Sequence, residues 1–179
     1  MTISYRQIGL RQGIGIDSDA YQQKDMTMNT VSNQASREHN EAGLAPLRVL
    51  LLDDDVFMLD VLSDMLEQMG QFDIRCESHS EQALSTLKQH QPDLLICDLS
   101  MPDIDGIEFL RMAAENGFRG GVVLLSGLHS AVRLAAERLA MANGLHILGT
   151  FRKPMESAEL QLMVNLQLQH TARQASVQA

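Results

Sequence analysis

The sequence lacks the features of a secreted or membrane-spanning protein. It has no run of about 18 or more apolar residues, the length expected of a transmembrane helix, and its amino terminus lacks the basic region and apolar stretch of a secretory signal. Cysteine is scarce as well. Cys76 and Cys97 are the only two, and both fall in expected strands, where buried thiols are more common than a disulfide or metal pair. We therefore expect a cytoplasmic protein with no membrane contact.

Basic side chains are also few. The 179 residues include 14 Lys and Arg against 23 Asp and Glu, giving a formal net charge of −9. Nucleic acids are bound chiefly through clustered Lys and Arg, and no such cluster occurs. A nucleic-acid partner is therefore not expected. The six histidines are scattered, without the spacing of metal ligands.

The first 45 residues differ in composition from the rest. They are rich in Gln, Ser, Asn and Gly, with only isolated apolar residues, too few to offset the entropy of ordering. We expect a disordered extension over residues 1–45, and Met26 and Met28 leave open an internal start of translation. A single domain is expected over residues 46–170. Residues 171–179 then form a short flexible tail, too short for a folded output domain.

What the sequence does contain is a set of polar side chains at the ends of apolar runs. Such runs are typical of parallel strands buried on both faces, whose carboxyl ends lie along one edge of the sheet. Open α/β sheets keep their chemistry at that edge. The set comprises Asp53 and Asp54 after Val49–Leu52, Asp98 after Leu94–Cys97, Ser126 after Val122–Leu125, and Lys153 just past Ile147–Leu148.

Three carboxylates gathered at one edge repel one another. At a separation of about 4 Å in a partly screened site, each like pair costs about 4 kcal/mol. The cluster must therefore take up a proton or hold a cation, and its hard oxygen ligands favour Mg²⁺. A metal beside Asp98, with the Ser126 hydroxyl and the Lys153 ammonium opposite, suits the transfer of a phosphoryl group to Asp98 as nucleophile.

Helical patterns separate the expected strands. Phe72, Ile74 and Cys76 alternate with charged residues, which is typical of an edge strand. Five βα units with right-handed crossovers give a flavodoxin-like (βα)5 doubly wound parallel sheet, an α/β fold with strand order 2-1-3-4-5. The expected helices are Val56–Met69, Ser80–Gln89, Gly106–Asn116, Ser130–Ala142 and Ser157–Gln169, and the core face of the first comprises Met58, Val61, Leu62, Met65 and Met69.

The last of these helices has an unusual pattern. Its apolar residues alternate with polar ones, which by periodicity alone predicts a strand, whereas its position after Lys153 favours a helix. Wound as a helix, the apolar residues cover more than half of the circumference. The surplus indicates either a dimer or partner contact or a frayed helix with exposed leucines. The alternating residues are Leu160, Leu162, Val164, Leu166 and Leu168.

Four segments resemble the receiver domain of two-component response regulators: Leu50–Asp55, Cys97–Gly106, Leu125–Gly127 and Arg152–Pro154. The resemblance covers Leu47 to about Gln169. It implies Mg²⁺ as cofactor, a histidine kinase or phosphotransfer protein as phosphoryl donor, and signalling through a downstream protein. The roles it implies are Asp98 as phospho-acceptor, Asp54 as direct metal ligand, Asp53 as ligand through water, Ser100 as a ligand through its backbone carbonyl, Ser126 and Lys153 as ligands of the phosphoryl oxygens, and Pro154 after a cis bond.

The sequence departs from that family at Thr150, the switch position where many receivers carry Tyr or Phe. Phe151 is adjacent, but neighbouring strand residues point to opposite faces. A module that binds partners without phosphorylation is therefore one alternative. A haloacid-dehalogenase-type phosphatase is another, although that family places its nucleophile first and its acidic pair last. The chain is not expected to be an enzyme beyond its own phosphorylation and dephosphorylation. The stretch Leu128–Pro154 also resembles receivers fused to cyclic-di-GMP phosphodiesterase modules.

Overall fold

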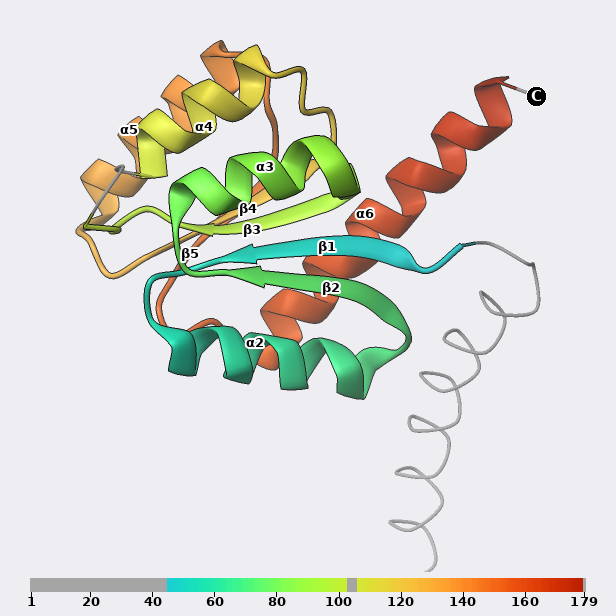
Figure 1. Cartoon of the computed structure of the whole chain (residues 1–179), viewed down its shortest axis with the longest axis horizontal. Coiled ribbons are helices and arrows are strands. Elements are labelled where there is room, and N and C mark those ends of the chain that lie inside the picture. Colours follow the sequence, from blue (N-terminus) through green and yellow to red (C-terminus); the bar gives the residue numbers. More distant parts are fainter. Residues whose placement is uncertain (1–44, 103–105, 179) are drawn as a thin grey trace, which may run out of the picture. The chain divides into compact units, whose positions relative to one another are not determined.

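The computed structural model describes residues 45–102 and 106–178, so the extension expected over residues 1–45 lies outside the described residues except for residue 45. Five parallel strands form one sheet in the order β2-β1-β3-β4-β5, which confirms the predicted doubly wound topology (Figure 1). The strands are β1 Leu47–Leu52, β2 Phe72–Glu77, β3 Leu94–Asp98, β4 Gly121–Ser126 and β5 His146–Arg152.

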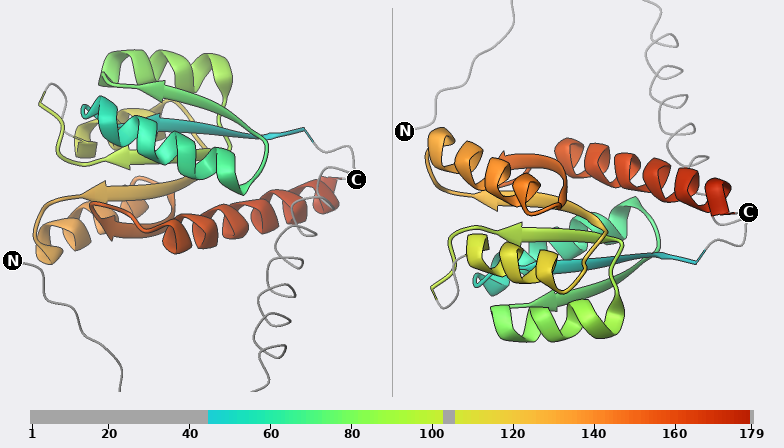
Figure 2. Two further views of the ribbon diagram at one scale, coloured as in Figure 1. Left: turned by 90° about the horizontal axis from the view of Figure 1, so that it is seen from below. Right: turned by 90° about the horizontal axis from the view of Figure 1, so that it is seen from above.

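Helices cover both faces of this sheet. Two of them pack on one face and three on the other (Figures 1 and 2). The first pair is α2 Val56–Met69 and α6 Ser157–Gln178, and the opposite layer is α3 Ser80–His90, α4 Gly106–Glu115 and α5 Ser130–Ala142. In the described part of the chain, none of these helices is long and apolar enough to cross a membrane.

The three central strands are almost completely buried because both of their faces carry helices. Successive residues alternate between two hydrophobic cores. In β1, Leu50 and Leu52 pack toward α3, α4 and α5, whereas Val49 and Leu51 pack toward α2 and α6. The continuous apolar runs seen in the sequence follow directly from this two-sided burial.

The core face of α2 differs from the prediction. Its buried residues are Leu59, Leu62 and Leu66, whereas Met65 and Met69 pack at the margin of the core. Leu59 and Leu66 are seven residues apart, two helical turns, so they share a face with Leu62. The predicted core face was therefore wrong in its orientation, because the methionines lie at the edge of the buried face and not at its centre.

Cys97 is buried, as predicted, but Cys76 is exposed, so its predicted burial was wrong. Cys76 lies on β2, the outermost strand next to β1, where no further strand covers its flank. Alternation in the sequence identified the strand, but not how far its neighbours cover it.

α6 is a helix, as its position predicted, and it continues to Gln178. The predicted end at Gln169 was wrong, because the helix includes most of the residues 171–179 that were expected to form a short tail. Leu160, Met163 and Val164 are buried, while Leu162 is 55% and Leu166 39% exposed. The predicted surplus of apolar surface on this helix is therefore present.

Candidate functional site

The carboxyl edge of the sheet gathers the polar residues that follow the strands. Asp98 and Ser126 are the last residues of β3 and β4, and Asp53 and Lys153 directly follow β1 and β5. Parallel pairing of β3 with β4, and of β4 with β5, aligns these strand ends. Ligand oxygens of Asp53, Asp54 and Asp98 lie within 4.8 Å of one another.

Lys153 joins two of these carboxylates. Its Nζ lies 2.6 Å from Asp53 Oδ2 and 2.9 Å from Asp98 Oδ2, and both carboxylates are buried. Burial lowers the pKa of Lys153, but hydrogen bonds to the two carboxylates outweigh burial and leave it raised. For Asp53, burial raises the pKa, and the hydrogen bond from Lys153 offsets only part of that effect.

The three carboxylates and one ammonium leave a formal charge of −2 when all are ionised, which suits a divalent cation. The donors available are carboxylate oxygens, the ligands that Mg²⁺ prefers. Asp54 is exposed, whereas Asp53 is 1% exposed. The residues therefore fit a hard cation reached from the side of Asp54.

Backbone hydrogen bonds hold the loop after β1. The N–H of Asp53 donates to the Glu77 carbonyl at 3.2 Å, and Asp53 Oδ1 accepts from the N–H of Asp55 at 3.0 Å. Asp55 in turn caps α2 by accepting from the N–H of Phe57 at 3.0 Å. This cap was not predicted from the sequence, although an Asp directly before Val56 is its usual signal.

The loop after β3 depends on Gly106, which sequence reasoning did not identify as a positioning residue. A Cβ at Gly106 would lie 2.5 Å from the Asp98 carbonyl oxygen and 2.6 Å from Leu99 Cα. Only glycine therefore permits α4 to begin against the end of β3. Within the same loop, Asp98 Oδ1 accepts from the N–H of Ser100 at 3.1 Å.

Ser126 is buried at the end of β4. Its Oγ accepts from the N–H of Leu128 at 2.9 Å, and its carbonyl accepts from the N–H of Lys153 at 3.1 Å. The Lys153–Pro154 peptide bond is cis. A Cβ at Gly127 would meet nothing within 4 Å, so the space next to Ser126 is open.

Thr150 and Phe151 point to opposite faces of β5. Thr150 Oγ1 donates to Glu137 Oε2 on α5 at 2.9 Å, whereas Phe151 packs in the core beneath α2 and α6. Phe151 therefore does not replace the aromatic side chain that many receivers carry at position 150. A hydrogen bond connects β5 to α5 at this position.

Comparison with known proteins agrees with this geometry. Residues 49–165 match the response regulator receiver domain family, and the chain belongs to that family. It is 32% identical to the chemotaxis protein CheY of Bacillus subtilis over 82 residues, 45% of this chain and 68% of CheY. It is 30% identical to the cyclic di-GMP phosphodiesterase RocR of Pseudomonas aeruginosa over 135 residues, 73% of this chain and 34% of RocR. A response regulator from Colwellia psychrerythraea has a similar structure, with a TM-score of 0.61 and 33% identity, over 70% of this chain and 99% of that one.

The chain spans about a third of the length of several curated relatives, RocR among them. Membership of the receiver family sets aside the haloacid-dehalogenase alternative, because the matched segment, residues 49–165, spans the acidic pair, Asp98, Ser126 and Lys153. Receiver domains are signalling modules that act together with kinases and targets.

Proposed function

We propose that this receiver signals by phosphorylation, accepting a phosphoryl group on Asp98 from a histidine kinase or phosphotransfer protein and then acting through contacts with another protein. The observation that carries the proposal is the position of Lys153 Nζ, 2.9 Å from Asp98 inside a cluster of three carboxylates. An ammonium at that distance can neutralise the oxygens of an arriving phosphoryl group. The open space beside Gly127 supports access to the site.

The chain offers a set of oxygen donors for Mg²⁺. Asp54, Asp98 and the backbone carbonyl of Ser100 would bind the cation directly, and Asp53 would act through water. The burial of Asp53 and its ion pair with Lys153 support this indirect role, as does the exposure of Asp54 for a direct one. Bound Mg²⁺ supplies positive charge for the transferring phosphoryl oxygens.

In the proposed reaction, a carboxylate oxygen of Asp98 attacks the phosphorus of a phosphohistidine. A P–O bond forms to Asp98 while the P–N bond breaks, and the leaving imidazole nitrogen takes up a proton. Lys153 and the Ser126 hydroxyl donate to the phosphoryl oxygens. In the later dephosphorylation step, water attacks phosphorus and the P–O bond to Asp98 breaks. This releases inorganic phosphate and restores the carboxylate.

The test is phosphorylation of the whole chain by acetyl phosphate with Mg²⁺, followed by intact mass. We expect the mass of one added phosphoryl group in the parent and none in Asp98→Asn, a nearly isosteric change that removes the nucleophile. Omitting Mg²⁺ should also suppress labelling. Equal labelling of the parent and the variant would assign the chemistry to another residue.

The output surface that we propose lies over α5, β5 and α6 and mediates a homodimer or a partner contact. The exposed apolar side chains of the two helices are Val132, Leu134, Leu139, Met141, Leu162 and Leu166, and Leu162 and Leu166, four residues apart, share one face of α6. Drawing Ser126 and Lys153 toward a phosphoryl group would shift β5, and the hydrogen bond between Thr150 and Glu137 would pass that shift to α5. The alternative, binding that ignores phosphorylation, is favoured by the absence of an aromatic ring at Thr150, and partner binding unaffected by Asp98→Asn would support it.

A further inference from the structure

A second concave site lies at the opposite edge of the sheet from Asp98. It is a pocket of about 420 Å³, a size in the range of small-molecule sites. Residues next to the amino ends of three strands line it: Arg48 in β1, Asp93 before β3 and Gly120 before β4. The carboxyl ends of α3 and α4 and the second half of α6 complete the wall.

The lining divides into an apolar floor and a polar rim. Leu87, Pro92, Ala113 and Phe118 on the floor are buried. The exposed rim residues are Lys88, Gln91, Asn116, Arg119 and Gln174. A floor and rim of this kind fit a molecule with an uncharged body and a polar head.

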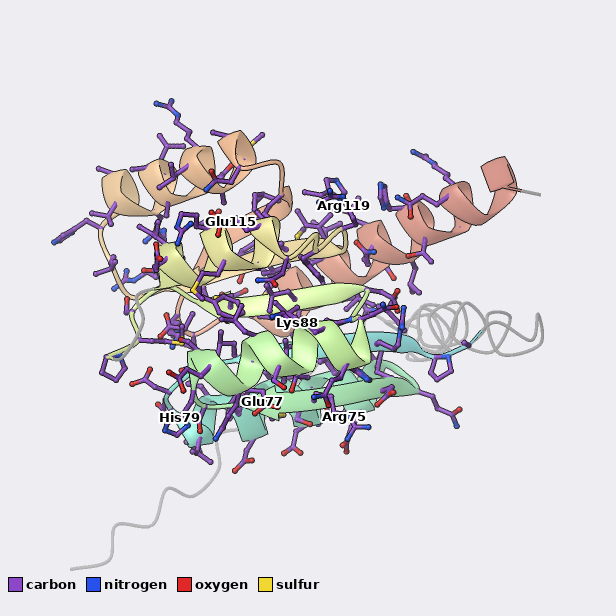
Figure 3. All side chains as sticks on the ribbon, turned by 45° about the horizontal axis from the view of Figure 1, so that its top comes forward. Arg75, Glu77, His79, Lys88, Glu115 and Arg119 are labelled. Atoms are coloured by element: carbon purple, nitrogen blue, oxygen red, sulfur yellow. The ribbon has the colours of Figure 1, made fainter. Side chains whose placement is uncertain are left out.

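The rim carries unbalanced positive charge. Arg48 and Asp93 neutralise each other through hydrogen bonds of 3.1 and 2.9 Å. Lys88 and Arg119, labelled in Figure 3, form no ion pair with any residue in the described part of the chain. The pocket therefore has a formal charge of +2 in a chain whose net charge is −9, and it should attract anions.

Part of the wall comes from the second half of α6. Gln167, Thr171 and Gln174 line the pocket, and all three lie beyond the segment 49–165 that matches the receiver family. Gln167 is 3% exposed and donates through Nε2 to Thr171 Oγ1 at 3.2 Å. Its Oε1 has no hydrogen-bond partner among the described residues and lies against Gly121. As an acceptor it takes no part in holding an anion, so that role falls to the basic side chains of the rim.

We infer that this pocket binds a small organic anion, with a phosphate or carboxylate group held by Lys88 and Arg119 and the body of the molecule on the floor of Leu87 and Phe118. The site is separate from Asp98, and its occupancy does not require phosphorylation.

The experiment follows amide chemical shifts of the whole chain without Mg²⁺ during titration with phenyl phosphate or benzoate, which share a flat apolar ring. Benzyl alcohol is the neutral control. We expect saturable shifts at residues 88–93 and 116–120 with the anions only, and the tighter of the two identifies the preferred head group. Lys88→Gln and Arg119→Gln should each weaken binding about tenfold. Arg138→Gln, an equal loss of charge on the exposed face of α5, should leave it unchanged.

Three results would overturn the inference. Shifts confined to residues 126–128 and 153 would place the anion at the phosphorylation site instead. Equal weakening of anion binding in Arg138→Gln would show that binding depends only on the overall charge of the chain. Equal chemical-shift changes with benzyl alcohol would show that binding depends only on the apolar ring. Both pocket variants replace exposed side chains, and unchanged shifts in β1 and β4 would verify their fold.

Discussion

Lys153 is the residue that links the buried carboxylates of the proposed phosphorylation site. Its ammonium pairs with both Asp53 and Asp98, so two buried carboxylates share one cation and Asp54 adds a third negative charge. Repulsion in the metal-free site therefore remains substantial, and it is relieved either by a cation or by removal of a carboxylate. Asp54 is the carboxylate that can be removed without breaking an ion pair.

Asp54→Ala should therefore stabilise the metal-free chain while weakening Mg²⁺ binding by at least about tenfold. We expect a gain of roughly 1 kcal/mol, or a Tm higher by about 3 °C. Calorimetry and Mg²⁺ titration measure the two effects. Asp64→Ala, which removes an exposed carboxylate from α2, is the control and should leave Mg²⁺ binding unchanged. An unaltered Mg²⁺ titration in Asp54→Ala would contradict the proposed site.

Gly106 predicts a contrasting pair of stability effects. Gly106→Ala should destabilise the domain by about 2–3 kcal/mol, because the added methyl group meets the backbone of Asp98 and Leu99 at 2.5 and 2.6 Å. Gly127→Ala places the same group in open space, so the free energy of unfolding should change by less than about 1 kcal/mol. Urea unfolding of both variants is the measurement, and equal effects would show that the loop after β3 adapts.

At the scale of elements, α5, β5 and α6 form the part of the domain best placed to transmit phosphorylation. Lys153 follows β5, and the backbone N–H of Lys153 donates to the Ser126 carbonyl, so movement of either residue is passed to the end of β5. The Thr150 hydroxyl reaches α5, whereas exposed leucines extend the apolar surface onto α6. The Thr150 side chain, which bonds to Glu137, is smaller than the aromatic ring that many receivers carry at this position. We therefore expect weak coupling between phosphorylation and the output surface, about 1 kcal/mol.

Leu162→Glu combined with Leu166→Glu should abolish self-association or partner binding through α6 without unfolding the domain, because both leucines are exposed. Sedimentation of parent and variant, each with and without a phosphoryl mimic, is the measurement. The matched control, Gln161→Glu with Asn165→Glu, adds the same charge at exposed polar positions of the same helix. Identical behaviour of the parent and the leucine variant in all conditions would leave this surface without a role.

At the scale of the whole molecule, the two edges of the sheet differ in charge. The carboxyl edge carries three clustered carboxylates, and the amino edge carries a pocket with two unpaired basic side chains among the described residues. The two proposed sites lie at opposite ends of the same strands, so binding at one would not block the other. The domain accounts for residues 45–178 of the chain.

Deleting residues 1–44 should leave both folding and phosphorylation of this domain intact, since the composition of that segment predicts no packed core. We expect a change in Tm of no more than a few degrees and the same phosphoryl incorporation from acetyl phosphate. Thermal unfolding and intact mass of the shortened chain test this. A much larger fall in Tm would indicate that the segment docks on the domain.

The sequence by itself determined the order of strands and helices and the residues at the carboxyl edge. Apolar runs and helical periodicity are local properties, and the ends of parallel strands must meet at one edge. Asp53, Asp98, Ser126 and Lys153 could therefore be grouped without coordinates.

Only the tertiary structure decided how much each element is covered and which side chains meet. The exposure of Cys76, the use of Leu59 and Leu66 in place of the methionine stripe, and the need for Gly106 all depend on contacts between segments far apart in the chain. The pocket beside Lys88 and Arg119 arises for the same reason, because α6 continues past the predicted end and packs beside the loops after α3 and α4. Periodicity reports the face that a residue shares, whereas burial and distance are set by what packs against that face.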